Sequence, residues 1–333
     1  MQTELIDKQN IVTFLNPLNL KNIMYDTIII GAGPAGLSAA IYTCRKKMKT
    51  LVISVDIGGQ ASLTAHIENY PGTEPQKGME LMDKFREQAE KFGAEFAFGK
   101  VKELKKNEDN TYSIKVADGT EHHAKSIILT FGKVPRMLGL PKEEELMGRG
   151  VSTCATCDGP LFKDKTVVVV GGGNSALEAV EDLSSHAKKV YLVHRRQEFR
   201  GDEVTIEKVK KNEKVEMILD SAVVGLDADN FLKGVTVENI KTNEKKELEV
   251  QGLFLEIGYV VDSSLVGELV ELNNRKEIVV DCLGKTSDKG IFAAGDVTTM
   301  PYKQAIIAAG EGAKAALSAY AYVTNNKAAP DWH

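Results

Sequence analysis

Cysteine is scarce in this sequence, with four residues among 333. A secreted domain that is held together by disulfides has far more cysteine for its length, so this class is excluded. Cys44 and Cys282 stand alone, whereas the other two cysteines form one unit, Cys154-Ala155-Thr156-Cys157. In a reducing compartment such a CxxC unit is more often catalytic or metal-binding than structural.

Long hydrophobic runs and an excess of positive charge are also missing. No stretch approaches the roughly 18 apolar residues that cross a bilayer. Residues 1–23 carry Glu4 and Asp7 and lack the apolar centre of a signal peptide. We therefore expect a cytoplasmic protein with no membrane segment. Lys and Arg number 42 against 47 Asp and Glu, so we expect no nucleic-acid partner, and any bound phosphate must be held locally.

The length predicts about two domains of roughly 150 residues each, and two segments of the chain share one pattern. Each is a β-branched run followed by G-x-G-x-x-G/A and then by small residues. The first contains Gly31-Ala32-Gly33-Pro34-Ala35-Gly36, and the second contains Gly171-Gly172-Gly173-Asn174-Ser175-Ala176. The run suits a buried parallel strand, and the glycines let backbone N–H groups approach a pyrophosphate at a helix N-terminus. One such motif is a weak signal, but two in this context predict two dinucleotide sites.

The second site carries a basic cluster. Its second strand, expected at Lys189–Val193, runs into His194-Arg195-Arg196 and then Arg200. An acid at this position would bind the ribose 2′-hydroxyl of NAD, whereas Arg accommodates a 2′-phosphate. A solvated basic turn is the alternative, and the register of the cluster favours an NADPH site.

The first site has no such cluster. After the strand expected at Leu51–Ser54 come Asp56, the segment Gly58-Gly59-Gln60 and the segment Glu68-Asn69-Tyr70-Pro71-Gly72. This suits a nucleotide without a 2′-phosphate, and FAD is the candidate. A plain surface loop is the alternative for any single residue here.

The C-terminal part of the chain supplies further candidates for the first site. Gly295-Asp296 follows an apolar strand and suits a ribitol or phosphate contact. The Ala-rich helix expected from Gln304 would direct its N-terminal dipole at negative charge on a reduced flavin. Because the second domain already closes near Ile257, this final segment is expected to complete the first.

The cysteine unit has two interpretations. A zinc site needs four ligands, but there is no second CxxC and the six His residues show no matching pair spacing. A redox pair needs only two sulfurs that can form a small ring, one attacking a disulfide and one resolving it. Asp158 could exchange a proton with a leaving thiolate. We favour the redox pair and expect no metal.

Other elements follow from local patterns. Alternating stretches on either side of Asp118-Gly119 predict an antiparallel hairpin, and a similar insert follows the second repeat. The expected elements are hairpin strands at Thr111–Val116 and Lys125–Leu129, the insert at Val235–Leu255, helices at Gly78–Phe92 and Glu203–Lys211, and joints at Lys133–Pro135 and Asp262–Ser264.

Together these motifs resemble one family. GAGPAG (31–36), GGQ (58–60), ENYPG (68–72), CATCDG (154–159), GGGNSA (171–176), HRRxxxR (194–200), GIFAAGDV (290–297) and PYKQA (301–305) are similar to those of the low-molecular-weight, bacterial and archaeal type of thioredoxin reductase. The resemblance runs from about Met24 to Val323. Two departures are Thr130-Phe131-Gly132, where the family often has Ala-Thr-Gly, and Gly258–Ser263, where Gly-x-x-Pro-Asn-Thr is usual.

The resemblance implies an α/β fold with two Rossmann-like, three-layer domains, the NADPH domain inserted in the FAD domain. It implies an N-terminal arm (1–23), an FAD-binding domain in two parts (24–133 and 263–333) and an NADPH-binding domain (134–262). The implied FAD contacts are Gly31, Gly33, Pro34, Ala35, Gly36, Asp56, Gly59, Gln60, Asn69, Gly295, Asp296, Gln304 and Ala305. The implied NADPH contacts are Gly171, Gly173, Asn174, Ser175, His194, Arg195, Arg196, Arg200 and Gly258.

The resemblance also implies a function. Cys157 would face the flavin, Cys154 would attack the disulfide of a thioredoxin or thioredoxin-like partner, and Asp158 would be the acid/base. A homodimer is implied, with one domain of each subunit rotating against the other. The alternatives are a related flavin reductase for a glutaredoxin-like or peroxiredoxin-system acceptor, a ferredoxin-dependent relative, and a non-catalytic zinc or nucleotide binder. Reduction of a free thioredoxin-like partner is favoured over these alternatives. Residues 1–23 are too short for a thioredoxin-like domain of the chain's own, and the intact HRRxxxR argues against a relative that has lost NADPH binding.

Overall fold

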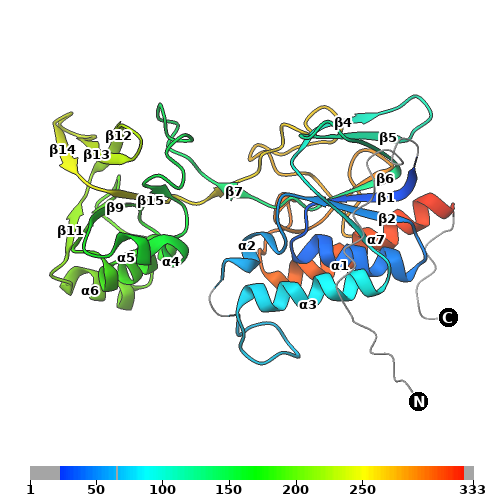
Figure 1. The fold of residues 1–333 in the computed structure, drawn as a ribbon, viewed down its shortest axis with the longest axis horizontal. Coiled ribbons are helices and arrows are strands. Elements are labelled where there is room, and N and C mark those ends of the chain that lie inside the picture. The colour runs from blue at the N-terminus through cyan, green and yellow to red at the C-terminus, as the bar shows by residue number, and fades with distance from the viewer. Residues whose placement is uncertain (1–22, 65–66, 326–333) are drawn as a thin grey trace, which may run out of the picture.

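The computed structural model describes residues 23–64 and 67–325. The chain folds into two lobes joined by a narrow connection (Figure 1). Each lobe is an α/β unit built on a largely parallel sheet, as the two Gly-rich repeats predict. Expectations for residues 1–22 of the N-terminal arm and for the tail Pro330–His333 lie outside the described residues.

The first lobe contains a seven-stranded sheet. Its strands are β1 (Met24–Ile30), β2 (Thr50–Ser54), β3 (Glu95–Phe98), β4 (Val101–Lys106), β5 (Tyr112–Val116), β6 (Glu121–Leu129) and β17 (Ile291–Ala293). The order is β3-β2-β1-β6-β5-β4, with β17 also paired to β6. Strand β1 is apolar without alternation because both of its faces are covered: Ile28 and Ile29 are fully buried in different core clusters. The antiparallel pairing of β5 with β6 confirms the predicted hairpin, but its second strand lies earlier than expected. Residues 121–124 pair with β5, whereas the expected stretch Lys125–Leu129 lies in the part of β6 that pairs in parallel with β1 and β17.

Helices lie against one face of this sheet (Figure 1). They are α1 (Pro34–Arg45), α2 (Gly59–Ser62), α3 (Gly78–Lys91) and α7 (Ala305–Thr324), and a short 3-10 turn, η3, spans Gly295–Val297. Helix α3 confirms the predicted helix, with Phe92 as its C-cap. Because β17 pairs with β6 and α7 packs on α1, the C-terminal segment completes the first lobe as expected.

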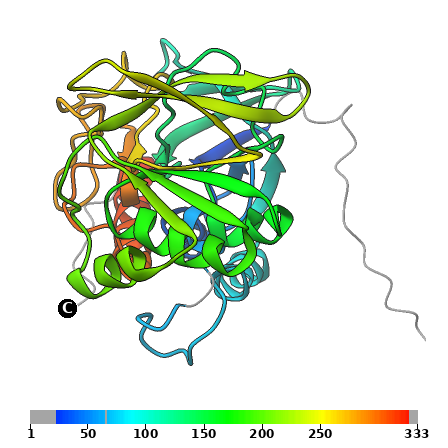
Figure 2. The same cartoon turned by 90° about the vertical axis from the view of Figure 1, so that its left-hand side faces the viewer.

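The second lobe carries two sheets that face each other. Its strands are β8 (Val151–Ser152), β9 (Thr166–Gly171), β10 (Lys189–Val193), β11 (Val215–Ile218), β12 (Ser221–Ala228), β13 (Leu232–Asn239), β14 (Lys245–Glu249) and β15 (Gly252–Glu256). The parallel sheet has the order β11-β10-β9-β15-β8, and β12, β13 and β14 form an antiparallel sheet. Figure 2 views this lobe from its outer side. The insert expected at Val235–Leu255 corresponds to β13, β14 and β15.

Helices cover the other face of the parallel sheet of the second lobe. They are α4 (Ala155–Asp158), the 3-10 turn η2 (Gly159–Phe162), α5 (Asn174–His186) and α6 (Glu203–Lys211). Side chains of β9 alternate between the layers: Val167 and Val169 pack with the helices, whereas Val168 and Val170 pack with the antiparallel sheet. This makes three layers. The predicted helix at Glu203–Lys211 is confirmed with the same bounds.

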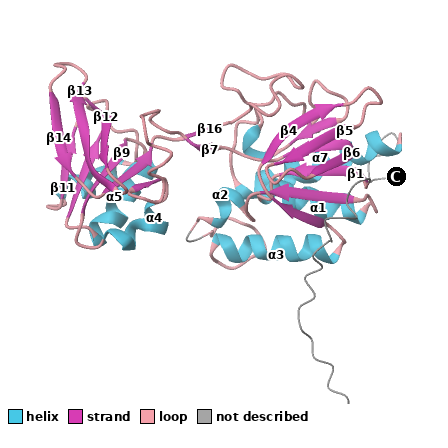
Figure 3. Cartoon of the chain, turned by 45° about the horizontal axis from the view of Figure 1, so that its top comes forward, coloured by secondary structure: helices cyan, strands magenta, loops and turns pink. Residues whose placement is uncertain are grey.

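The two lobes are connected by β7 (Val134–Pro135) and β16 (Tyr259–Val260), which pair antiparallel (Figure 3). The first predicted joint, Lys133–Pro135, contains β7. The second crossing lies slightly before the joint expected at Asp262–Ser264, because Val261 already packs in a core cluster of the first lobe. The chain therefore leaves the first lobe once and returns once, through two strands of two residues each.

Candidate functional site

The first Gly-rich turn joins β1 to α1 and leaves room for glycine alone at two positions. Gly31 has φ +109°, and a Cβ there would lie 2.5 Å from the Thr130 carbonyl oxygen. A Cβ on Gly36 would lie 1.9 Å from the Gly31 carbonyl oxygen. Gly33 is the N-cap of α1 and offers no side chain to satisfy the first amides of the helix. These amides are available to a phosphate group.

The segment after β2 lies against this turn. The Gly58 amide donates to the Ala32 carbonyl at 2.7 Å, and a Cβ on Gly59 would lie 3.7 Å from the Gly33 Cα. The Asp56 carboxylate accepts a hydrogen bond from the Gly59 amide at 3.2 Å. The structure thus gathers Asp56, Gly59 and Gln60 beside the first turn, with Asp56 exposed at its rim.

The C-terminal candidates reach the same place. Built on Gly295, a Cβ would lie 3.1 Å from the Ala35 Cβ, so η3 and the first turn of α1 are in contact. The Asn69 amide donates to the Gln304 side chain at 3.2 Å, and Ala305 begins α7. Burial raises the pKa of the Asp296 carboxyl, opposed by the charges of Lys303 and Lys133.

Two residues that sequence reasoning missed hold this arrangement together. The buried Glu311 carboxylate of α7 accepts a hydrogen bond from the Gly295 amide at 2.8 Å. The buried Thr130 hydroxyl donates to the carbonyls of Ile30 and Gly31, at 3.0 and 2.9 Å. A lone acid within the Ala-rich run after Gln304 was the available signal for Glu311. Thr130 was noted only as a departure from the family's usual Ala-Thr-Gly, and its role could not be inferred because its partners lie about 100 residues earlier in the chain.

The second Gly-rich turn, between β9 and α5, is packed against the predicted basic cluster. A Cβ on Gly172 would lie 2.1 Å from the His194 ring, so the imidazole rests directly on the backbone of the turn. Gly173 is the N-cap of α5, which again leaves the first amides of a helix for a phosphate. His194 also stacks on Phe199, with ring centroids 5.3 Å apart.

The loop after β10 is fastened to the same turn. The Arg200 amide donates to the Gly172 carbonyl at 2.7 Å, and the Asp202 amide donates to the Asn174 side chain at 2.8 Å. Burial lowers the pKa of His194, and the charges of the three arginines lower it further, against one backbone hydrogen bond that raises it. Arg195, Arg196 and Arg200 therefore surround one imidazole beside the turn. Ser175 is exposed on the first turn of α5.

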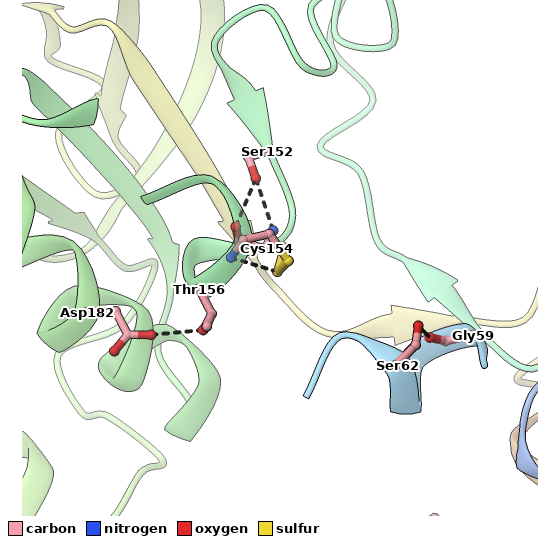
Figure 4. Close-up of a disulfide and its surroundings, with 7 residues drawn as sticks. Gly59, Ser62, Ser152, Cys154, Thr156 and Asp182 are labelled. Atoms are coloured by element: carbon pink, nitrogen blue, oxygen red, sulfur yellow. Dashed lines mark hydrogen bonds between the residues drawn. A yellow bond between two sulfur atoms is a disulfide. The ribbon is translucent and has the colours of Figure 1, made fainter. Parts of the chain in front are cut away.

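Cys154 and Cys157 form a disulfide at the end of β8 (Figure 4). Cys154 is the N-cap of α4, and its sulfur accepts a hydrogen bond from the Cys157 amide at 3.2 Å. The Ser152 hydroxyl accepts from the Cys154 amide at 3.0 Å. Within α4, the Thr156 hydroxyl donates to the Asp182 carboxylate of α5 at 2.9 Å. The CxxC unit is therefore fixed to the sheet and to α5, whereas Cys157 itself is exposed.

The disulfide and the second Gly-rich turn lie at one edge of the parallel sheet. β8, β9 and β15 run parallel, so Gly171 at the end of β9 lies at the same edge as Cys154 and Gly258, which follow β8 and β15. The side of the second lobe that carries α4 faces α2 of the first lobe (Figures 1 and 3). Asp158, half-buried at the end of α4, donates its amide to the Cys154 carbonyl at 3.1 Å.

Two other kinds of site are absent from the described residues. Within residues 23–64 and 67–325, no three His, Cys, Asp or Glu side chains gather as metal ligands. In the same ranges no helix combines the length and the apolar character needed to cross a bilayer.

Comparisons with known proteins agree with this geometry. The family model for pyridine nucleotide-disulphide oxidoreductases matches residues 25–312. Thioredoxin reductase of Mycolicibacterium smegmatis is 41% identical over 307 residues, covering 91% of this chain and 97% of that protein. The crystal structure of Lactococcus lactis thioredoxin reductase in its FR conformation is 39% identical, covers 90% of this chain and 99% of that one, and superposes with a TM-score of 0.79.

A second solved structure superposes less well. Thioredoxin reductase of Streptococcus pyogenes is 38% identical and covers 91% of this chain and 99% of its own, with a TM-score of 0.58. Identity and coverage of this order over both lobes cannot arise from one shared domain alone. The chain therefore belongs to the pyridine nucleotide-disulphide oxidoreductase family and, within it, to the low-molecular-weight thioredoxin reductases.

Proposed function

We propose that this chain is an NADPH-dependent, FAD-containing reductase of thioredoxin. The observation that carries the proposal is the placement of a CxxC disulfide at the same sheet edge as a Gly-rich turn with three arginines. That edge belongs to a lobe joined through β7 and β16 to a second lobe with its own Gly-rich turn. A ferredoxin-dependent relative or a non-catalytic zinc or nucleotide binder would not account for all three parts, whereas a related flavin reductase with another acceptor would and is separated by the assay below.

The first lobe suits FAD. The amides at the start of α1 would hold the pyrophosphate, and Asp56 would bind the ribose of the adenosine half. Asp296 would contact the ribitol or a phosphate, since its half-buried carboxyl holds a proton more readily than an exposed one. The N-terminus of α7, at Gln304 and Ala305, would stabilise negative charge on the ring system. When bound, FAD would supply a group that takes up a hydride and passes its two electrons to a disulfide.

The second lobe suits NADPH. The start of α5 would hold the pyrophosphate, and the guanidinium groups of Arg195, Arg196 and Arg200 would bind the 2′-phosphate through paired N–H groups. Because burial and the arginine charges keep His194 neutral at physiological pH, its ring contributes packing to this pocket rather than charge.

The cysteine pair would export the electrons. In the reduced pair, the Cys154 thiolate attacks the partner's disulfide, forms a mixed disulfide and releases one partner thiolate. Cys157 then attacks the Cys154 sulfur, which restores the Cys154–Cys157 disulfide and releases the second thiolate. Asp158 would exchange the protons that the released thiolates take up. Two electrons leave the enzyme in each cycle.

The assignment of Cys154 as the attacking sulfur follows the family resemblance, and the hydrogen bonding of this sulfur supports it. Cys157 is the more exposed of the two, so exposure by itself would select the other sulfur. The amide of Cys157, however, donates to the Cys154 sulfur, and such a bond stabilises a thiolate at Cys154.

A rotation of the lobes is part of the proposal. The disulfide and the NADPH site share one edge of one lobe, so they would approach the flavin of the other lobe in turn rather than together. The connection through β7 and β16 is short enough to act as a hinge. The two solved relatives are 39% and 38% identical to this chain but superpose with TM-scores of 0.79 and 0.58, which supports different lobe orientations among these proteins.

We also propose a cytoplasmic homodimer whose partner is a thioredoxin or thioredoxin-like protein. The test is a steady-state assay in which the purified flavoprotein oxidises NADPH, or NADH, in the presence of oxidised thioredoxin, a glutaredoxin or a peroxiredoxin-system protein. NADPH oxidation that depends on thioredoxin is the expected result. Turnover with another acceptor only would support the related-reductase alternative, and no turnover with any acceptor would contradict the proposal.

A further inference from the structure

The strand order of the second lobe indicates where each half of a dinucleotide would lie. The order is β11-β10-β9-β15-β8. The strands β10 and β11 that follow β9 in the chain therefore lie on one side of β9, and β15 lies on its other side. Ligands of open α/β sheets bind across such a switch point, at the carboxyl ends of the strands. The arginine cluster follows β10 and the Gly-rich turn follows β9. With the 2′-phosphate over β10 and the pyrophosphate at β9, the nicotinamide half would lie over the end of β15.

Glu256 is the residue at that end. It is the last residue of β15 and lies opposite Gly171 in the register with β9. Phe254, two residues earlier on the same face, packs with Leu177 and Val180 of α5. Side chains two apart in a strand share a face, so Glu256 lies on the α5 side of the sheet, beside the Gly-rich turn.

The surroundings of this carboxyl hold no compensating cation in the described part of the chain. Burial and, to a smaller extent, the negative charge of Glu178 on α5 together raise the pKa of Glu256 to about 7. Tyr259, just after β15, is the other titratable neighbour. Burial and then the charge of Glu256 raise its pKa, so its phenol stays neutral. A half-buried carboxylate between an acid and a phenol would be stabilised by a positively charged ligand.

We propose that Glu256 distinguishes oxidised from reduced nicotinamide, because its carboxylate would lie beside the one ring form that is positively charged. This inference rests on the proposed NADPH site. Reduced and oxidised nicotinamide differ by one hydride, that is, by two electrons and one proton, and only the oxidised ring carries the extra positive charge. A carboxylate at this position would bind the oxidised form more tightly and so favour hydride donation to the flavin.

Binding affinities measured as a function of pH test this without relying on turnover. The ligands are NADP⁺ and tetrahydro-NADP, a neutral-ring analogue that donates no hydride, each titrated into the oxidised holoenzyme from about pH 5.5 to about pH 8.5, a range that brackets the titration. Both carry the same 2′-phosphate, so its titration cancels in the ratio of the two affinities. In the wild-type protein the ratio should shift toward NADP⁺ by about tenfold as pH rises, as a coupling of one pKa unit requires.

Four variants separate this role from a structural one. Glu256→Gln should make the ratio independent of pH while keeping the affinity for tetrahydro-NADP, and Glu256→Asp should restore part of the pH dependence. Glu178→Gln should move the midpoint to lower pH, because it removes the charge that raises the pKa of Glu256. Glu249→Gln, at the exposed end of β14, should leave the ratio unchanged.

The outcomes are distinguishable. A ratio that does not change with pH in the wild-type protein, or one that keeps its pH dependence in Glu256→Gln, would overturn the inference and leave the proposed function standing. If neither ligand bound at all, the proposed NADPH site would be wrong, and the inference would fail with it.

Discussion

At the end of β10, Arg195 and Arg196 occupy positions where an acid would bind the ribose 2′-hydroxyl of NADH. We expect the double variant Arg195→Ala/Arg196→Ala to raise the KM for NADPH far more than that for NADH. Loss of paired hydrogen bonds to a phosphate costs on the order of 1.5–3 kcal/mol. Steady-state kinetics with both cofactors measure this. Lys188→Ala, an exposed charge at the other end of β10, is the control, and equal effects on NADPH and NADH would refute the phosphate assignment.

Leu161 offers a second test on single residues. It lies in η2, just after the CxxC unit, and is 69% exposed. An apolar side chain so exposed beside a reactive disulfide suits contact with a protein partner. Leu161→Glu should raise the KM for thioredoxin about tenfold or more, the cost of a desolvated charge in an interface, and leave flavin reduction by NADPH unchanged.

The matched control for Leu161 is Val204→Glu in α6 of the same lobe, since Val204 is equally exposed at 69%. If both variants raised the KM alike, or if neither did, Leu161 would have no specific place in the partner's contact surface.

Helix α7 packs on α1 through a position that admits no side chain. On Gly312, a Cβ would lie 2.0 Å from the Ala35 carbonyl oxygen. Gly312→Ala should therefore separate α7 from the first Gly-rich turn, lower the melting temperature and, if this turn binds FAD as proposed, reduce the flavin content of the purified protein. Overpacking of this kind costs about 1–3 kcal/mol or more.

Gly310, on the same helix, provides the control. A Cβ there meets nothing within 4 Å, so Gly310→Ala should stabilise the helix by about 0.5–1 kcal/mol. Thermal unfolding and flavin absorbance measure both variants. The packing account would be contradicted if Gly312→Ala kept its flavin and its melting temperature.

Asp288 ties the hairpin to the segment before β17. Its carboxylate accepts from the Tyr112 hydroxyl at 2.5 Å and pairs with Lys106 at 2.7 Å. Burial raises the pKa of Asp288, but the bonds to Lys106, Tyr112 and the Gly290 amide outweigh burial, and the net pKa is lowered. A lowered pKa stabilises the fold above the unfolded pKa, and this contribution is lost as pH falls through the folded value.

Asp288→Asn should therefore destabilise the protein at neutral pH by about 1.5–3 kcal/mol, the size of hydrogen bonds to a charged group. The difference in melting temperature between wild type and variant should shrink as the pH falls below about 4, the unfolded pKa of Asp. A difference that stayed constant across this range would show that the charge of Asp288 contributes nothing.

Elements with a strong local pattern could be predicted from the sequence, and contacts across long separations could not. The helix at Glu203–Lys211 follows from the periodicity of its apolar residues. The C-terminal segment was assigned to the first lobe because the second domain was already complete near Ile257, and the pairing of β17 with β6 confirms this. The second joint was set slightly late because nothing local marks Val261 as a core residue. Thr130, Glu311 and Glu256 were missed because each acts on a distant segment.

At the scale of the whole molecule, the few cysteines of this chain include one pair at a position suited to redox chemistry. The one CxxC unit lies on a lobe with its own Gly-rich turn, and the chain enters and leaves that lobe through β7 and β16. Because the disulfide and the Gly-rich turn with its arginine cluster lie at the same edge of this lobe, electron transfer by rotation of one lobe against the other is favoured. The family shows that such chains reduce disulfides, whereas the assignment of NADPH, FAD and each sulfur is our proposal.

The most direct test of that proposal is the Cys154→Ser holoenzyme, followed under anaerobic conditions with NADPH and oxidised thioredoxin. We expect NADPH to bleach the flavin as in the wild type, because the Gly-rich turns and the arginine cluster are intact. Thioredoxin should remain oxidised, because the attacking sulfur is gone. Continued reduction of thioredoxin by this variant, or a flavin that NADPH cannot bleach, would contradict the account.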